Sequence, residues 1–380
     1  MKTNDILLSV VIPAYNVEPY LEKCVYSMLP YEYPESHLIE ILIINDGSKD
    51  STLDVARKLA SQYKQVTVID KENGGHGSTI NVGIKCAKGK YFRIIDGDDW
   101  VDSKNFIKFL QQLQMTDADI VLTDVSYEYA DSKDLAPYVN YIFQPNMTLN
   151  FDEVYQSGGF NKFGPVLAST TYKLENLKKS GFYITEHSAY VDMELNAFSV
   201  KNANTLIYYR LDVYRYLIGR VGQTVSKEVW MKKYKEHERI IFNLINFIER
   251  DSGLASCKID YIEEKLIAPM VNSQVYMYDQ ICKWDELMVF LRTLSNNNTV
   301  YTKCMSYIYD LNGDCKLILN KYLERVEQKE NNYPIIHIVS PSNAIVENKS
   351  FSGIKFIRKI IKMILPYGIV RIYQKKKYGY

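Results

Sequence analysis

The sequence predicts an α/β fold in which a mostly parallel central sheet is flanked by helices, followed by a mainly helical C-terminal extension. Two observations support this prediction. Short apolar runs alternate with longer helical patterns in the N-terminal part, an order typical of parallel strands joined by right-handed crossovers. From about residue 227 to residue 330 the pattern changes to helices with few turn signals.

Four apolar runs rich in Val, Ile or aromatic residues are the expected strands, and they cover residues 7–12, 39–44, 66–69 and 91–95. Such near-continuous runs indicate strands that are buried on both faces. Helical patterns follow the four runs in turn, at residues 20–28, 51–62, 78–87 and 103–114. A fifth strand is expected at 120–123. We predict a first domain at 1–226, a mainly helical extension at 227–345 and a basic amphipathic tail at 346–380.

Composition excludes several classes of protein. The 380 residues carry a net charge of +1, but residues 351–380 contain eight Lys or Arg and no Asp or Glu, so the remaining body is mildly acidic. An acidic body argues against nucleic-acid binding. The six cysteines are scattered without a C-x-x-C pair, which favours reduced thiols in a cytoplasmic protein over disulfides or a zinc site. Neither a signal peptide nor a membrane-spanning run is expected.

Polar segments follow the expected strands, at residues 13–16, 45–48, 73–77 and 96–99. Ligands of open parallel sheets bind beyond the carboxyl ends of the strands, so these four loops are expected to surround one cleft. The sharpest feature is Asp96-Gly97-Asp98-Asp99, whose three carboxylates repel one another unless a cation intervenes. Mg²⁺ or Mn²⁺ would suit such oxygen ligands. The alternative is a solvated turn that caps the helix at 103–114.

Taken together, these segments resemble family 2 glycosyltransferases with the GT-A fold. The matching segments are residues 9–16, 44–52, 96–99 and the pair Asn81 and Gly83. The resemblance covers about residues 6–225, and the ordered set is more specific than any single motif. It implies a nucleotide-diphosphate sugar donor and a divalent metal.

The resemblance also implies roles for individual positions. Pro13 would contact the nucleotide, Tyr15 would lie near the base, and Asp46 would bind the base or the ribose. Asp96 would approach the ribose, and Asp98 would ligate the metal with Asp99 in support. Glu18 stands where the family often has another nucleotide contact.

Two positions depart from the family pattern. The usual Ala-Arg-Asn triplet is here Thr79-Ile80-Asn81, so a basic side chain is missing. His76 in the preceding Gly-rich loop is a candidate to replace it at the pyrophosphate, and a solvated turn residue is the alternative. Farther along, the family's Glu-Asp pair, whose Asp is the catalytic base, is here Val191-Asp192.

Asp192 is therefore the predicted base, with Glu194 as the fallback and a helix-capping role as the alternative. The stretch at 214–226 resembles the family's later basic segment near the donor phosphates. Arg220 in this stretch is a candidate to offset the charge of the leaving group. Simple surface exposure is the equal alternative for this side chain.

Other functions fit the sequence less well. The Gly75-x-Gly77 pair fails the dinucleotide-binding pattern, since Ile80 stands at the third glycine position. A sugar nucleotidyltransferase usually shows a Gly-rich basic loop after the first strand, which residues 13–16 do not provide. A sugar-nucleotide-binding protein without transferase activity remains, although the retention of Asp98 and Asp192 speaks against it.

The sequence therefore predicts a metal-dependent inverting glycosyltransferase. UDP is the expected donor nucleotide, and the acceptor is expected to be a glycan or lipid-linked hydroxyl in cell-surface polysaccharide synthesis. Apolar residues recur at helical spacing within 353–365 and are bordered by Lys and Arg, so the tail at 351–380 is expected to bind an anionic membrane surface. The predicted location is cytoplasmic, peripheral at the inner face of the cell membrane. A tail helix packed on the acidic body is the alternative.

Overall fold

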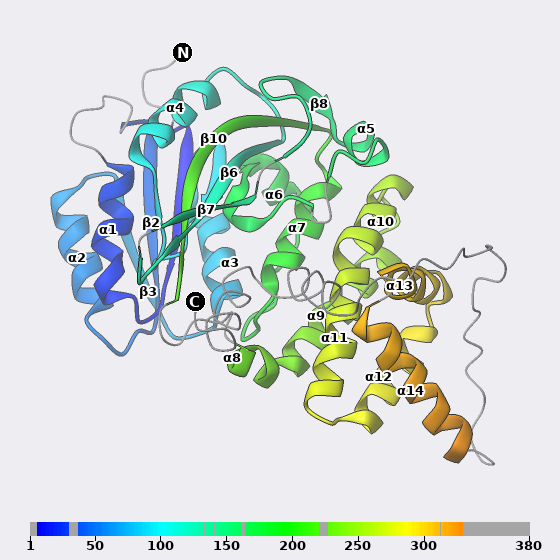
Figure 1. Cartoon of the computed structure of the whole chain (residues 1–380). Coiled ribbons are helices and arrows are strands. Elements are labelled where there is room, and N and C mark those ends of the chain that lie inside the picture. Colours follow the sequence, from blue (N-terminus) through cyan, green and yellow to red (C-terminus); the bar gives the residue numbers. More distant parts are fainter. Residues whose placement is uncertain are drawn as a thin grey trace. The chain divides into compact units, whose positions relative to one another are not determined.

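The computed structural model describes residues 6–29, 37–132, 134–139, 141–160, 164–219, 227–311 and 313–329 (Figure 1). The chain forms two compact units. Of the described residues, the first unit comprises those up to residue 219 together with 253–258, and the second comprises 227–252 and 259–329. The basic tail predicted at 346–380 lies outside the described residues.

The first unit is built on one mixed sheet with the strand order β3-β2-β1-β4-β9-β6-β10-β5, in which β7 also pairs with β6 and β8 with β10. Its strands are β1 Leu8–Ala14, β2 Ile39–Asp46, β3 Val66–Lys71, β4 Tyr91–Ile94, β5 Trp100–Val101, β6 Ile120–Tyr129, β7 Leu135–Val139, β8 Thr148–Asn150, β9 Thr170–Lys173 and β10 Thr205–Ile218.

The N-terminal half of this sheet is parallel. Val10 on β1 faces Ile41 on β2 and Arg93 on β4, and β3 continues the parallel arrangement beyond β2. These are the first four predicted strands, and the fifth prediction corresponds to the start of β6. The other half is mixed, because β9 runs antiparallel between β4 and β6, while β10 is parallel to β6.

Helices cover both faces of the sheet (Figure 1). Helices α1, α2 and α4 lie on one side, and α3 and α6 lie on the other, where α3 contacts β1, β2, α6 and α7. The helices of this unit are α1 Glu18–Met28, α2 Thr52–Gln62, α3 His76–Cys86, α4 Ser103–Leu113, α5 Phe151–Gln156, α6 Leu174–Ser180 and α7 Val191–Lys201, with a 3₁₀ turn at Leu167–Ser169. The four predicted helices are confirmed as α1 to α4.

Burial on both faces explains the apolar strands. Val10 packs into the core beneath α1 and α2, while its neighbour Val11 faces the other way toward α3, and neither side chain is exposed. Close contact on the α3 side depends on Gly83, because a Cβ there would lie 2.7 Å from Val11. Adjacent residues of β1 therefore belong to two different packing layers, as expected for a covered parallel sheet.

The second unit is helical, as predicted for this part of the chain. Its elements are α8 Lys227–Lys232, α9 Tyr234–Arg250, the end of α10 Ser256–Ile262, a π-helical turn Glu263–Ile267, α11 Ala268–Gln280, α12 Trp284–Ser295, α13 Asn298–Leu311 and α14 Asp314–Lys329. Helix α11 is central and contacts α9, α12, α13 and α14. His237 lies in this core, bonded to Gln274 at 2.7 Å, and burial lowers its pKa to about 4, which makes it a neutral structural residue. Along the part of the chain that the structure describes, no helix combines the length and apolarity needed to cross a membrane.

Candidate active site

The acidic turn Asp96–Asp99 lies directly after β4, where it meets the end of β1. Gly97 N donates to Pro13 O at 3.2 Å, and Asp99 N donates to Asp96 O at 2.9 Å to close the turn. A Cβ on Gly97 would lie 2.9 Å from both Pro13 O and the Val17 side chain, so only glycine fits this crossing. The turn is thus held closely against the end of the first strand.

Asp99 points into the protein and is 2% exposed. Its carboxylate accepts hydrogen bonds from Tyr214 Oη at 2.7 Å and Leu217 N at 2.8 Å, both on β10. Burial and the neighbouring charges of Asp98 and Asp96 raise the pKa of Asp99 well above its usual range. The cap of α4 is Asp102, which accepts from Asn105 N at 2.9 Å. The alternative in which the acidic turn caps this helix is therefore wrong.

Asp96 and Asp98 are partly exposed, unlike Asp99. Both carboxylates act on the same two buried groups, the Cys24 thiol and the Tyr216 hydroxyl. Burial raises the pKa of each group most, and the charges of Asp96 and Asp98 raise it further. Within the described ranges, no group of three or more His, Cys, Asp or Glu side chains is arranged to hold a metal ion. Mg²⁺ typically needs only one or two carboxylates when substrate phosphates complete its ligands, so Asp96 and Asp98 fit a metal that arrives with a diphosphate.

His76 is the first residue of α3 and lies beside the acidic turn. Its Nε2 is 3.0 Å from Asp96 Oδ1. Burial alone would lower the pKa of His76, but the hydrogen bond and charge of Asp96, with further contributions from Asp192 and Asp98, raise it above the ordinary value. The solvated-turn alternative does not describe this side chain, because it is engaged with a carboxylate at the start of a helix.

Asp46 organises the loop that precedes α3. Its carboxylate accepts from Lys71 Nζ at 2.7 Å, Gly75 N at 2.8 Å and Gly74 N at 2.9 Å, and the residue is 3% exposed. Asn73 Nδ2 adds contacts to Asp46 O at 2.8 Å and Oδ2 at 3.1 Å. These bonds hold residues 71–75 against the end of β2. Contact between Asp46 and a base or ribose stays a prediction.

Tyr15 and Glu18 lie on the exposed side of the β1 end. Tyr15 is 48% exposed, so its ring is available to a planar ligand. Glu18 is also exposed, and its Oε2 accepts from Ser51 N at 3.1 Å, which ties α1 to the start of α2. Pro13 is buried within β1 and contributes its carbonyl to Gly97. Nucleotide contacts by these three residues stay predictions.

Asp192 lies in the first turn of α7, after Tyr190, whose φ is 65°. No side-chain hydrogen bond caps this helix, so Asp192 is not its cap. Burial raises the pKa of Asp192, and the charges of His76 and Asp96 lower and raise it respectively. Asp192 therefore lies within electrostatic range of His76 and Asp96, although it stands about a hundred residues away in the chain.

Glu194 has a different environment. It is 1% exposed, and its two oxygens accept from Thr185 N at 2.8 Å and Thr185 Oγ1 at 2.7 Å. Both bonds lie within the segment that leads into α7. Glu194 therefore braces this segment and does not face an open space.

The same segment is fixed to α3 at its other end. Asn81 donates from Nδ2 to Ile184 O at 2.8 Å and accepts from Ile184 N at 2.9 Å. His187 N donates to Gly74 O at 2.6 Å. A Cβ on Gly77 would lie 2.2 Å from Thr185 O, so α3 approaches the segment at a distance that only glycine allows. The loop after β3 and the start of α7 thus form one connected wall.

Sequence reasoning missed an aromatic group in this unit. Tyr127 on β6, Tyr138 on β7 and Tyr216 on β10 contact one another, with Tyr127 stacked on Tyr138 at 4.4 Å between ring centroids. These three tyrosines do not stand out in the sequence because Tyr is frequent throughout the chain, with 32 copies. Arg220, the candidate for the leaving group, lies outside the described residues.

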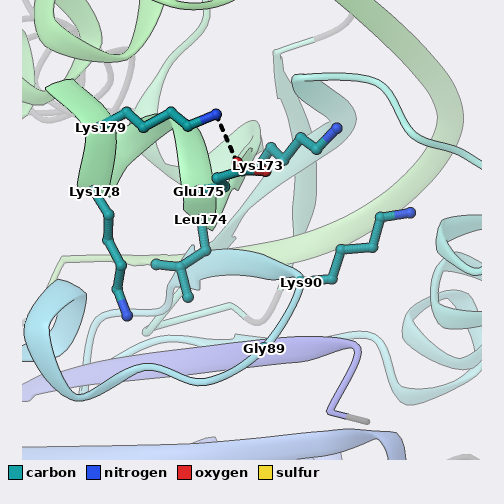
Figure 2. A pocket seen from close by; sticks show the side chains of 7 residues that line it. All are labelled: Gly89, Lys90, Lys173, Leu174, Glu175, Lys178 and Lys179. Carbon is teal, nitrogen blue, oxygen red and sulfur yellow. Dashed lines mark ion pairs between the residues drawn. The ribbon is translucent and has the colours of Figure 1, made fainter. Parts of the chain in front are cut away.

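A hollow of about 500 Å³ opens at the opposite end of β4 (Figure 2). Lys90 precedes β4, whereas Asp96 follows it, so this hollow is separate from the acidic turn. The lysines around it are already engaged, with Lys179 paired to Glu175 at 2.6 Å and Lys173 to Asp117 at 2.9 Å. Its lining residues are Gly89, Lys90, Lys173, Leu174, Glu175, Lys178 and Lys179.

The mixed sheet, with an acidic turn after β4 and further acidic residues at the start of α7, defines the GT-A class of glycosyltransferase folds. The crystal structure of S. aureus TarS 1–349 in complex with UDP-GlcNAc shares this fold, with a TM-score of 0.60 and 16% identity over 90% of this chain and 100% of that one. Residues 9–178 match the model of glycosyl transferase family 2, so this part of the chain is similar to that family.

Relatives of known sequence agree with this assignment. An uncharacterized glycosyltransferase, EpsJ of Bacillus subtilis (strain 168), is 35% identical over 148 residues, which are 39% of this chain and 41% of that protein. Glycosyltransferase GlyG of Streptococcus pneumoniae serotype 4 (strain ATCC BAA-334 / TIGR4) is 39% identical over 127 residues, which are 33% of this chain and 41% of that protein. The match thus spans about two fifths of the length of these relatives.

Proposed function

We propose that this protein is a metal-dependent, inverting glycosyltransferase that moves a sugar from a nucleotide-diphosphate donor, with UDP as the nucleotide. The acceptor is a hydroxyl of a glycan or lipid-linked molecule in cell-surface polysaccharide synthesis. One observation carries the proposal: His76 lies 3.0 Å from the partly exposed Asp96, and the charges of Asp98 and of Asp192, which comes from a distant part of the chain, also act on it. The two TarS complexes that contain UDP-GlcNAc and UDP, with TM-scores of 0.60 and 0.51, support the donor class.

In this proposal the residues divide between donor and acceptor. Tyr15 stacks on the base, and Pro13, Glu18 and Asp46 shape the nucleotide site around it. Asp96 approaches the ribose, and Asp98 holds the Mg²⁺ or Mn²⁺ ion. When bound, the metal would offset the negative charge of the diphosphate.

The basic groups belong to the diphosphate side of the site. His76 at the start of α3, whose Nε2 lies 3.0 Å from Asp96 Oδ1, is proposed to contact the diphosphate as it leaves. The N-terminal end of a helix favours negative charge, which supports this position. Arg220 is proposed to serve the same leaving group.

Asp192 is proposed as the general base. The acceptor hydroxyl loses its proton to the Asp192 carboxylate as its oxygen bonds to the anomeric carbon, while the bond from that carbon to the diphosphate oxygen breaks. The nucleotide diphosphate leaves with the electron pair, and the anomeric configuration inverts. Glu194 is unsuited to this role because Thr185 occupies both of its oxygens.

A donor screen tests this function. Purified protein is incubated with Mn²⁺, individual nucleotide sugars and a panel of glycoside acceptors, and the release of nucleotide diphosphate and the mass of the product are measured. We expect one donor to give both signals. Binding without release would favour the sugar-nucleotide-binding alternative, and pyrophosphate exchange would favour a nucleotidyltransferase.

We also propose that residues 351–380 hold the enzyme at the inner face of the cell membrane. The support is compositional, since this stretch carries eight basic residues and no acidic ones. Each such charge contributes about 1 kcal/mol near an anionic lipid surface. Attachment to the membrane surface would place the enzyme close to an acceptor that is linked to a lipid.

A further inference from the structure

The aromatic group of Tyr127, Tyr138 and Tyr216 has no part in the mechanism above, yet its three rings are packed against one another in defined geometries. Tyr216 and Tyr127 are partners in the parallel pairing of β10 and β6. Their rings meet edge to face, with centroids 5.7 Å apart and an angle of 79°. Tyr127 is buried, and it supports the Tyr138 ring in a stacked contact at 4.4 Å and 23°. One face of the Tyr138 ring is therefore fixed by packing.

An irregularity in the pairing of β7 with β6 leaves the side chain of Tyr138 exposed. In the antiparallel pairing with β6, Ser126 faces Pro137 and the next residue, Val125, faces Val139, so Tyr138 has no partner in the register. An extra residue of this kind is a β-bulge, which redirects a side chain and occurs often beside active sites. Pro137 is compatible with this position because, among the strands that the structure describes, β7 pairs with β6 alone and forms an edge. As a result, the large aromatic side chain of Tyr138 remains 42% exposed.

The place of this ring follows from its neighbours. Tyr216 lies between Tyr214 and Leu217 on β10, the two residues that bond Asp99. Burial raises the pKa of Tyr216, and the charges of Asp99 and Asp96 raise it further. The Tyr138 ring lies next to that of Tyr216, with ring centroids 6.3 Å apart, and partial burial followed by the charge of Asp192 raises the pKa of Tyr138. The aromatic group thus extends from Tyr216, beside the acidic turn, to the exposed ring of Tyr138 on β7.

From the stacking, the bulge and this position, we propose that Tyr138 is a stacking platform for a pyranose ring of the acceptor, which presents its hydroxyl to Asp192. The C–H face of a sugar ring carries slight positive charge and packs on the negative face of an aromatic ring. The inference rests on the proposed function and adds the class of acceptor: a sugar, rather than a polyol or a bare lipid alcohol. An acceptor is favoured over the nucleotide of the donor because Tyr138 stands on β7 beside β6, whereas Tyr15 and Asp46 lie at the ends of β1 and β2, on the other side of β4 in the strand order.

Three variants test the platform. Tyr138→Ala removes the ring, and Tyr138→Phe keeps the ring without the hydroxyl. The matched control is Tyr26→Ala on α1, because Tyr26 is similarly exposed, at 39%, and also packs on another tyrosine ring, that of Tyr63. Melting temperatures establish that each variant is folded.

Sugar binding is measured without turnover, by saturation-transfer NMR with methyl glycosides of common hexoses in the presence of UDP and Mn²⁺. We expect signals for the wild type, Tyr138→Phe and Tyr26→Ala, and about a tenfold weaker affinity for Tyr138→Ala. UDP affinity is measured by calorimetry and should be equal in all four proteins. Equal glycoside binding in Tyr138→Ala, no glycoside binding in the wild type, or a loss of UDP affinity with the ring would each overturn the platform.

Failure of the proposed function gives a different result. In that case the wild type releases no nucleotide diphosphate from any donor, whatever the glycoside measurement shows. If transfer is observed, the acceptor KM should rise about tenfold in Tyr138→Ala while kcat changes less. A fall in kcat at constant KM would place the ring in the chemical step and contradict a binding platform.

Discussion

The hydroxyl of Tyr214 on β10 donates a hydrogen bond to Asp99 Oδ2 at 2.7 Å and accepts one from Asp96 N at 3.2 Å. A single phenol therefore bonds two residues of the acidic turn, from a strand more than a hundred residues later in the chain. Since Leu217 N also donates to Asp99, β10 sets the conformation of the turn that offers Asp98. The metal-binding property proposed for this turn depends on that support.

Tyr214→Phe should test this relationship. The variant lacks the hydroxyl that donates a hydrogen bond to Oδ2 of the buried Asp99. Loss of this hydrogen bond should lower the free energy of unfolding by about 1–3 kcal/mol. Urea unfolding measures the loss. We also expect weaker Mn²⁺-dependent UDP binding, since the turn loses its brace. The matched control is Tyr209→Phe on the same strand. The Tyr209 hydroxyl donates to Gln112 O at 3.1 Å rather than to the acidic turn, so this variant should leave UDP affinity unchanged.

Asp98→Asn should abolish the effect of metal on donor binding. The amide keeps the shape of the side chain but lacks the charge that attracts a divalent cation. Calorimetric titration with UDP, with and without Mn²⁺, should show a metal-dependent gain in affinity for the wild type only. Metal-dependent affinity that survives in the variant, or transfer that persists in a chelator, would remove Asp98 from the metal site.

Asp192→Asn should lower kcat by roughly 10²-fold or more, because the variant cannot accept the proton of the acceptor. Donor affinity should be nearly unchanged. Glu194→Gln is the comparison: it weakens the bonds to Thr185 and is expected to lower the melting temperature more than the chemical step. If only the Glu194 variant loses turnover, the two roles are exchanged.

The pH profile gives an independent view of the base. Asp192 acts only when ionised, so the rate should rise with pH through the pKa of this carboxyl. Because burial raises that pKa, the acid limb should lie above the range of an exposed aspartate. The charge of His76 lowers the same pKa while that of Asp96 raises it, so His76→Asn should move the acid limb to higher pH. An unmoved limb would show that His76 does not act on the base.

The tail prediction is tested by vesicle flotation. Full-length protein should float with phosphatidylglycerol-containing vesicles at low salt and be released by high salt, because screening weakens attraction to the surface. Protein that ends at Ser350 should stay at the bottom of the gradient. Equal flotation of both forms, or none by the full-length protein, would assign the tail a structural role.

The sequence alone determined the order and type of the first eight elements, from β1 to α4 apart from the short β5. Each is a local pattern: an apolar strand, a polar turn and an amphipathic helix, whose period is set by backbone geometry. The acidic turn after β4 was equally readable, since the glycine and the carboxylates lie side by side. The helical character of residues 227–329 followed from the same kind of local periodicity.

Only the tertiary structure decided which distant groups meet. The insertion of β9 between β4 and β6 is an antiparallel pairing over a long stretch of chain, and no local period encodes it. The same holds for Tyr214 against Asp99, for Asn81 against Ile184, and for the bulge that exposes Tyr138. Glu194 and Asp192 are both acidic residues in the same short stretch of sequence. They differ in the structure because both oxygens of the buried Glu194 accept hydrogen bonds from Thr185. Long-range packing makes this distinction because a carboxylate's properties depend on the charges and donors around it, and the fold supplies them from elsewhere in the chain.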